Sequence, residues 1–458
     1  MKPYTSIPHA RTASPAGSAR TLRTKSGKVA PLLAAGGALA LFATIAAIPA
    51  AAAETTLSEV DRQAVVLVDF RNRTLADPQQ THDQAVRNFF GPTDSLASYY
   101  AENSHGRMSV VPAEGDGVFG PITLDMDDTA ACDTDKIAEL ARKAVPDVDY
   151  NHISIVLRSN YCSDWWGLAN MPGDVSWFHE AAVADKAALV HEIGHNLGLD
   201  HQERQICTAD NFTACTDDGY SNRTPMGGGG AKKGLTAPEL QSLKWLTAQQ
   251  VTTPTATTTV RLTPLHATGT SGVRAIDLPL GSGGDRIVVE YRTPDSATPD
   301  IDIAQGVNVY RISGGRYSDA VMISNVKRDD KSAAGSLVAD TSLADTSAHV
   351  SIRVSQATAA GADVHIQLGS GTGPRPAATP PAPVPAKSAP AKSTQHADNP
   401  ADIGSAITSP PAQPSTRAGS SLAATGASAL GPAVIGVVLV TAGATATVLL
   451  GRRRTRKH

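Results

Sequence analysis

Residues 191–201 read HEIGHNLGLDH, and the interpretation of the whole chain depends on this stretch. We expect a helix from about Ala181 to Leu197, which places His191 and His195 one turn apart on one face, where both imidazoles can reach one metal ion. Glu192 lies about a quarter of a turn away. Its carboxylate can therefore act on a metal-bound water without being a ligand, as metal-assisted hydrolysis requires.

The residues that follow complete a ligand set. Gly198 can adopt the positive φ that ends a helix and turns the chain. His201 can then return as a third ligand, which leaves a fourth tetrahedral position for water and indicates one catalytic zinc ion. The alternative is an ordinary helix with surface histidines, and the presence of Gly198 and His201 in addition to the HExxH pattern disfavours it.

The pattern HExxHxxGxxH resembles that of the metzincin metallopeptidases. The resemblance implies an α/β (α+β) catalytic domain with a twisted mixed sheet, an active-site helix and a methionine in a tight turn beneath the zinc. Met226, in the sequence TPMG, fits this Met-turn, and a core methionine is the alternative. The gametolysin (peptidase M11) branch is the most similar one, on the words VLVDF at 66–70, YYAENSHG at 99–106, WGLA at 166–169 and LKWL at 243–246.

The resemblance leaves the residue that polarises the substrate carbonyl unassigned, and it suggests which strand edge binds the substrate. Some metzincins carry a tyrosine two residues after the methionine, where this chain has Gly228. The group that polarises the scissile carbonyl is therefore unassigned, with Tyr220 as a guess. Metzincins bind substrate as an extra strand at a sheet edge, whose counterpart here is Trp166–Met171. Trp165, Trp166 and Trp177 either line that cleft or belong to the core.

Charge and the first residues indicate export. The chain has 458 residues and a formal net charge of −3, with basic residues and no acids in both 1–53 and 426–458. An acidic middle with basic ends argues against nucleic-acid binding. Residues 1–53 have the basic, apolar and small-residue regions of a signal peptide, with a retained signal anchor as the alternative.

Four cysteines in an exported chain predict two disulfides, for which three pairings exist. We favour Cys207 with Cys215, which would close the loop after His201, and Cys132 with Cys162. A second zinc site made of these four residues is the alternative.

A change in the pattern of predicted helices and strands divides the chain into a catalytic domain, 54–250, and a β-rich accessory domain of sandwich type, 251–368. In the first we expect strands near 65–68, 107–112, 118–124 and 152–157, and helices near 93–103, 133–145 and 235–246. In the second we expect short alternating strands at 259–262, 273–278, 286–292, 307–312, 350–354 and 362–368.

The last 90 residues predict surface attachment. Residues 369–421 are rich in Pro, Ala and Ser, which predicts an unfolded spacer. The segment 422–458 holds LAATG, an apolar run near 433–450 that is long enough to span a membrane, and a basic tail. It resembles the sorting signals of Gram-positive, actinobacterial-like surface proteins, in which a sortase would cut between Thr425 and Gly426 and join the chain to peptidoglycan. A plain single-pass membrane anchor is the alternative.

Together these features predict a secreted, cell-surface-anchored zinc endopeptidase. It would hydrolyse peptide bonds of protein or peptide substrates through a zinc-bound water, with Glu192 as the general base. One alternative is a surface binding module or adhesin on an inactive metzincin scaffold. The other is a zinc hydrolase with a substrate that is not a protein.

Overall fold

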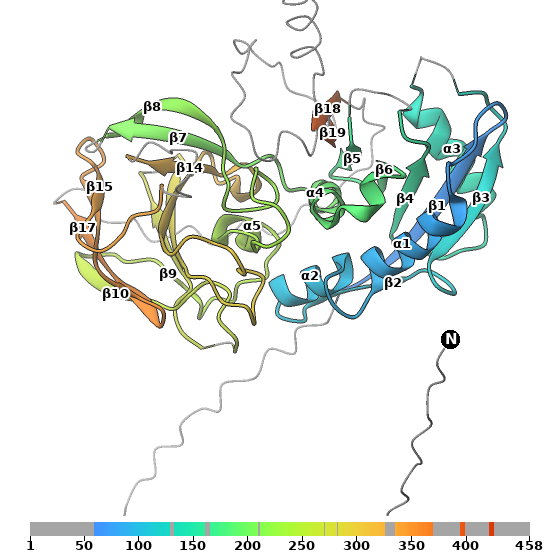
Figure 1. Ribbon diagram of the computed structural model, residues 1–458. Coiled ribbons are helices and arrows are strands. Elements are labelled where there is room, and N and C mark those ends of the chain that lie inside the picture. The colour runs from blue at the N-terminus through green and yellow to red at the C-terminus, as the bar shows by residue number, and fades with distance from the viewer. Residues whose placement is uncertain are drawn as a thin grey trace, which may run out of the picture. The chain divides into compact units, whose positions relative to one another are not determined.

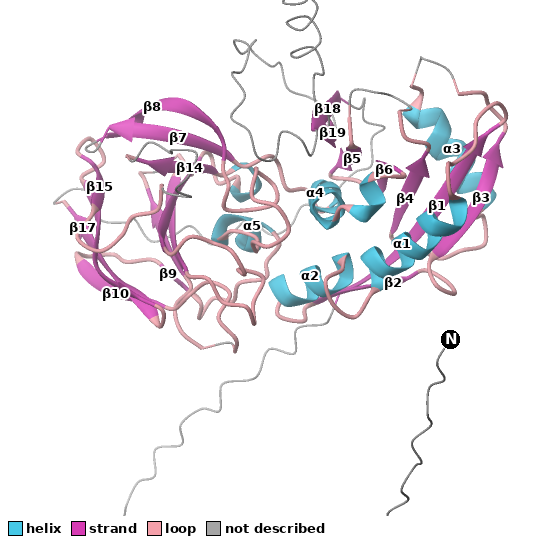
Figure 2. Cartoon of the chain, viewed as in Figure 1, coloured by secondary structure: helices cyan, strands magenta, loops and turns pink. Residues whose placement is uncertain are grey.

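The computed structural model describes residues 59–128, 132–160, 165–208, 211–269, 271–281, 283–325 and 335–369, and two short strands near the C-terminus. Figure 1 draws these residues in colour, and Figure 2 separates the helices from the strands. All of them belong to one compact unit that begins at Thr56. No helix in this described part is long and apolar enough to cross a membrane. The expected signal peptide, 1–53, and the apolar run near 433–450 lie outside it.

The first sheet is built around β1 (Glu59–Phe70), whose centre is an uninterrupted apolar run. Side chains alternate across a strand, so Val65 and Leu67 enter one core cluster while Val66 and Val68 enter another. Such two-sided burial is typical of a parallel sheet between helices. β1 is parallel to β2 (Met108–Pro112), β3 (Val118–Leu124) and β4 (His152–Leu157), and β4 is parallel to β6 (Val175–His179), which pairs antiparallel with β5 (Gly167–Met171).

Helices cover both faces of this sheet. α3 (Thr134–Ala144) buries Ile137 and Ala141 in the cluster that contains Val66. The opposite cluster, around Val65, receives buried residues of α1 (Pro78–Phe90), α2 (Leu96–Asn103) and α4 (Lys186–Asn196). The prediction of a mixed α/β domain is therefore confirmed.

The active-site helix is shorter than the sequence predicts. Ala182–Ala184 form a separate 3₁₀ turn, and Asp185 follows in an extended conformation. The Asp185 carboxylate accepts a hydrogen bond from the backbone N–H of Ala187 at 2.9 Å, which caps a new helix that starts at Lys186. The expected single helix from Ala181 is wrong because this N-cap competes with helix continuation.

The second sheet contains strands from distant parts of the chain. Its seven strands lie in the order β8-β7-β14-β13-β12-β11-β9. β7 and β8 precede residue 250, and β7 is parallel to β14, with Arg204 opposite Met322. The bounds are β7 (Glu203–Thr208), β8 (Asn211–Tyr220), β9 (Val251–Thr252), β11 (Ala275–Pro279), β12 (Arg286–Arg292), β13 (Gly306–Ile312) and β14 (Val321–Ser324).

A third sheet covers one face of the second. Its antiparallel strands are β10 (Thr258–Leu262), β17 (Gly361–Leu368), β16 (Val350–Thr358) and β15 (Ser342–Asp345). Along β12, Ile287 and Val289 enter the cluster shared with the third sheet. Val288 points the other way, into the cluster of the catalytic helices. The second sheet is therefore a layer between the catalytic helices and the third sheet.

Three short elements complete the description. α5 (Ala237–Ser242) precedes β9, and the 3₁₀ turn η2 (Tyr317–Asp319) precedes β14. β18 (Thr394–Asp398) lies within the stretch predicted as a spacer, and β19 (Ser421–Thr425) includes the first residues of LAATG. β18 and β19 are parallel to each other, and β19 is antiparallel to β5. Gly426 lies outside the described residues.

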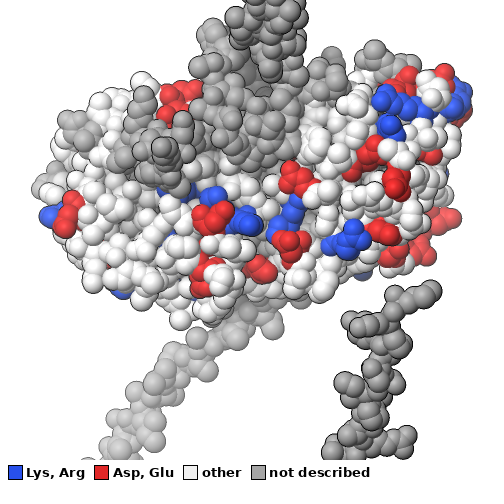
Figure 3. All heavy atoms as spheres, in the orientation of Figure 1, with Lys and Arg blue, Asp and Glu red and all other residues white. Residues whose placement is uncertain are grey.

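Charges of both signs are mixed on the surface. On the face drawn in Figure 3, Lys and Arg lie beside Asp and Glu rather than in one large patch. Arg71 illustrates the arrangement, because its guanidinium lies 3.0 Å from both Asp125 and Asp127. Exposed pairs of this kind contribute little to stability.

Candidate active site

α4 brings the first two histidines together. His191 and His195 lie one turn apart, both are buried, and their Nε2 atoms are 2.9 Å apart. The helix is fixed by Leu189 and Ile193, which are fully buried in the adjoining core cluster. The spacing of four residues therefore gives the shared face that the sequence predicts.

The third histidine arrives through a turn at Gly198, whose φ is +91°. This conformation favours glycine, as the sequence predicts. The Nε2 atom of His201 lies 3.2 Å from that of His191, and ligand atoms of the three histidines all lie within 4.8 Å of one another. Two nitrogens bound tetrahedrally to one zinc, each at about 2.0–2.1 Å, are about 3.3 Å apart, so the cluster fits one ion.

Backbone carbonyls orient two of the rings. His191 Nδ1 lies 2.8 Å from the carbonyl oxygen of Pro225, and His195 Nδ1 lies 2.7 Å from that of Leu199. A carbonyl can only accept, so each Nδ1 carries the proton and each Nε2 presents a lone pair to the cluster. This pairing of ligand and carbonyl is the usual support of a metal-binding histidine.

Glu192 follows His191 on α4 and is fully buried. Its carboxylate belongs to the same helix as two of the clustered imidazoles, at the position that the sequence predicts for a general base. Its catalytic role stays a prediction.

Met226 lies against the middle of α4. It is fully buried, and a methyl group at Gly194 would lie 2.3 Å from Met226 Sδ, so only glycine at position 194 leaves room for the thioether. Met226 also shares a core cluster with Ile193. Both descriptions of Met226, a Met-turn residue and a core residue, thus apply to its position.

The glycines after Met226 permit close backbone contacts. A Cβ at Gly227 would lie 1.9 Å from the carbonyl oxygen of Ser221. The N–H of Gly228 donates to the same oxygen at 2.7 Å. The turn is therefore compact, and position 228 carries no side chain for catalysis.

Tyr220, at the end of β8, lies beside the third histidine. Its ring centroid is 5.4 Å from that of His201, and the residue is 45% exposed. Acidic residues surround the same corner: burial raises the pKa of Glu203, and Asp217, Asp319 and Asp200 raise it further.

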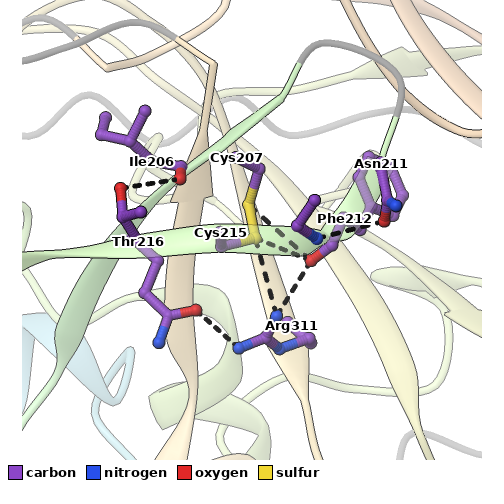
Figure 4. The surroundings of a disulfide bond; sticks show 9 residues. Ile206, Cys207, Asn211, Phe212, Cys215, Thr216 and Arg311 are labelled. Carbon is purple, nitrogen blue, oxygen red and sulfur yellow. Dashed lines mark hydrogen bonds between the residues drawn. A yellow bond between two sulfur atoms is a disulfide. The ribbon is translucent and has the colours of Figure 1, made fainter.

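The cysteines form disulfides. Cys207 of β7 is bonded to Cys215 of β8, the pairing predicted for the loop after His201. Arg311 of β13 donates to the carbonyl of Phe212 at 2.9 Å and contacts Cys215, so the hairpin is attached to the second sheet (Figure 4). Cys132 is disulfide-bonded as well, and its predicted partner Cys162 lies outside the described residues. A second zinc site made of the four cysteines is thereby excluded.

The expected substrate edge coincides with β5, which lies between β6 and β19 in the sheet. Asn196, at the end of α4, donates to the carbonyls of Asn170 and Val175, both at 2.9 Å, and so fixes β5 and β6 to the helix. Trp165 and Trp177 are buried in a core cluster, which supports the core alternative for both, whereas Trp166 is partly buried.

Sequence reasoning missed the residues that hold the Met-turn. The Glu239 carboxylate accepts from the Thr224 hydroxyl, two residues before Met226. The only signal in the sequence was Thr236-x-x-Glu239, which predicts a capping box and no tertiary contact. That capping box is present at the start of α5.

Comparison with known families agrees with this geometry. Residues 62–285 match the sequence model of gametolysin peptidase M11. The chain carries a peptidase M11 domain. Its three clustered histidines are consistent with the metal site of such an enzyme, and the protein is a metalloendopeptidase.

Comparisons with curated proteins and with solved structures add little to the description of this domain. No curated protein matches the chain. Among solved structures, wild-type OgpA from Akkermansia muciniphila matches in two crystal forms, at 11% and 10% identity and a TM-score of 0.26 for both. The matches cover 58% of this chain and 93% and 92% of those chains. This TM-score is too low to support an argument.

Proposed function

We propose that the chain is an exported zinc endopeptidase in which His191, His195 and His201 hold the ion and Glu192 is the general base. The three Nε2 atoms, which face one another with separations suited to one zinc, are the observation that supports this most directly. When bound, the zinc supplies a Lewis acid that lowers the pKa of water to about 7. Glu192 takes the proton from the attacking water and delivers it to the leaving amine.

Two further groups would position the substrate. The edge of β5 that pairs with β19 in the structure would offer its backbone N–H and C=O groups to an extended peptide that takes the place of β19, a form of binding that does not depend on the peptide sequence. Tyr220 is exposed beside His201, from where its hydroxyl would donate a hydrogen bond to the scissile carbonyl as charge develops there.

A chelator and variant series tests the proposal. Removal of zinc should abolish casein cleavage by the purified chain, and added zinc should restore it. Glu192→Gln should retain zinc but lose at least about a hundredfold in kcat, the low end for general-base removal. The control Glu114→Gln changes an exposed carboxylate elsewhere and should keep full activity. Casein cleavage by Glu192→Gln at the parental rate would contradict the assignment.

The proposed location is the cell surface. A leader at 1–53 would export the chain, and a sortase would cut between Thr425 and Gly426 and attach the product to peptidoglycan. Mass spectrometry of the protein released from the wall tests this step. A C-terminus at Thr425 is expected, whereas a C-terminal peptide that extends into the basic tail would show a plain membrane anchor.

A further inference from the structure

One buried carboxylate connects two loops of the zinc site. Glu239 is 2% exposed, and it accepts hydrogen bonds from the Thr224 hydroxyl at 2.8 Å and from the Gln202 side-chain amide at 3.4 Å. Gln202 directly follows His201, and Thr224 precedes Met226 by two residues. Glu239 therefore reaches both irregular segments that complete the site after α4.

Both segments touch the metal-site residues directly. The backbone N–H of Gln202 donates to the carbonyl of Met226 at 2.9 Å, which joins the residue after His201 to the Met-turn. The carbonyl of Pro225, between Thr224 and Met226, accepts from His191 Nδ1 at 2.8 Å. A shift of Thr224 would consequently move the carbonyl that orients His191.

The helix that carries Glu239 is held from the second sheet. Glu290 of β12 accepts from the backbone N–H of Ala237, the first residue of α5, at 2.6 Å. Its other oxygen accepts from Asn308 and from Tyr310 of β13, both at 2.8 Å. Four donors that include Arg292 thus surround one buried carboxylate.

A second buried pair holds the loop before α5. Arg292 forms an ion pair with Asp300 and donates to the carbonyl of Gly234 at 3.0 Å. Asp300 accepts from the N–H of Gly234 at 3.0 Å. Both backbone groups of Gly234 are therefore bound to side chains that come from after residue 250.

Burial of the ionisable side chains of Glu239, Glu290, Arg292 and Asp300 costs free energy. Glu290 and Arg292 are fully buried, and burial raises the pKa of Glu239 to about 7. Apolar residues in place of a buried ionic cluster are often as stable or more stable. Stability alone is therefore a weak explanation for these charges, whereas the definition of one loop geometry is a direct consequence of their hydrogen bonds.

We propose that Glu239 and Glu290 are positioning residues of the zinc site, so that the strands after residue 250 take part in shaping the metal centre. Glu239 fixes the Met-turn and the segment after His201 relative to each other. Glu290 fixes the start of α5 and with it Glu239. The proposal rests on the zinc site proposed above.

A matched pair of variants at Thr224 tests the first link in the full-length protein. Thr224→Val keeps the size of the side chain but removes the hydroxyl that donates to Glu239, whereas Thr224→Ser keeps the hydroxyl. We expect Thr224→Val to weaken zinc binding about 10-fold or more, as removal of supporting groups around a metal typically does. Thr224→Ser should bind zinc within about twofold of the parent. The measurements are zinc affinity by chelator competition and the visible spectrum of the cobalt-substituted protein.

A second pair tests the contribution of β12. Glu290→Gln replaces one acceptor oxygen by an amide nitrogen, which donates and would face other donors. Like Thr224→Val, this variant should weaken zinc binding. The control Tyr291→Phe removes a partly buried hydrogen bond to the carbonyl of Thr358 at 2.7 Å, on the far side of the same sheet. It should lower stability but leave zinc affinity and the cobalt spectrum unchanged.

The outcomes separate this proposal from the proposed function. A parent protein that binds no zinc would overturn the proposed function. A parent that binds zinc, together with a folded Thr224→Val variant of equal affinity and spectrum, would overturn the positioning role. If Glu290→Gln does not fold, the Thr224 pair alone decides the result.

Discussion

His191 and His195 lie on one helix, whereas His201 and the Met-turn lie in irregular chain. The helical half of the site is set by the spacing of four residues, an N-cap at Asp185 and burial of Leu189. The irregular half depends on partners that are far away in sequence, such as Glu290, which is 53 residues from Ala237. One half of the site is thus determined by local sequence and the other by tertiary contacts.

In the irregular half, the largest effect that we expect is a change in the free energy of unfolding with pH. Burial raises the pKa of Glu239 to about 7 from 4.5, with Glu290 adding to the rise and hydrogen bonds from Thr236 and Thr224 opposing it. Between these two values the folded state binds more protons than the unfolded state, so stability should fall as the pH rises. The total fall is about 3 kcal/mol, at about 1.4 kcal/mol per pKa unit.

Denaturant unfolding of the metal-free protein and of Glu239→Gln at pH 5 and pH 8 measures this fall. Other titrating groups, including the three histidines, are common to both proteins and cancel in the difference. The parent should lose stability relative to Glu239→Gln on going to pH 8. Equal differences at the two pH values would show that Glu239 does not titrate in this range.

The disulfide of the β7–β8 hairpin gives the next effect. Cys207→Ser with Cys215→Ser should cost about 2.5 kcal/mol, the chain-entropy value for a closed loop of about eight residues. The contacts of Arg311 with Phe212 should retain part of the hairpin, so zinc should still bind. Denaturant unfolding gives the stability, and a chelator titration gives the zinc affinity. Loss of zinc binding in a folded double variant would show that the disulfide is needed for the position of His201.

Gly194→Ala tests the contact between the two halves. The added methyl group would lie 2.3 Å from Met226 Sδ, and overpacking of this kind costs about 2 kcal/mol. Gly194→Ala with Met226→Ala should show a favourable coupling relative to the sum of the single variants, because the second change removes the clashing sulfur. Thermal unfolding of all four proteins measures the coupling. Additive costs would place the thioether away from Gly194.

The smallest expected effect is catalytic. Tyr220→Phe should lower kcat about tenfold with KM nearly unchanged, because the hydroxyl would act on the carbonyl in the transition state. Zinc affinity should stay at the parental value. An unchanged kcat would leave carbonyl polarisation to another group.

Sequence predicted the strands that have a clear local signal. The ranges 118–124, 152–157 and 286–292 agree in full with β3, β4 and β12, since each is bounded by turn residues and rich in β-branched residues. α1 was missed because its sequence, PQQTHDQAVRNFF, is mostly polar. β7, ERQICT, contains few β-branched residues and is a strand because of its pairing with β8 and β14.

The same distinction applies to the site. The three histidines, Glu192 and Gly198 could be named because their spacing carries the geometry. The connection from Thr224 through Glu239 to Glu290 could not, since hydrogen bonds between residues on separate elements leave no periodic trace in sequence. Sequence located the three histidines that cluster, and only the fold shows what supports them.

The parallel pairing of β7 with β14 limits how the enzyme can be shortened. A recombinant fragment that stops near residue 250 would leave β7 with unpaired N–H and C=O groups along 204–206. It would also remove Val288 and Met322 from the core cluster that contains Leu189 and Ile193. Open strand edges and bare apolar surface promote aggregation. The shortest soluble peptidase that can be expressed from this gene should therefore extend at least to Leu368.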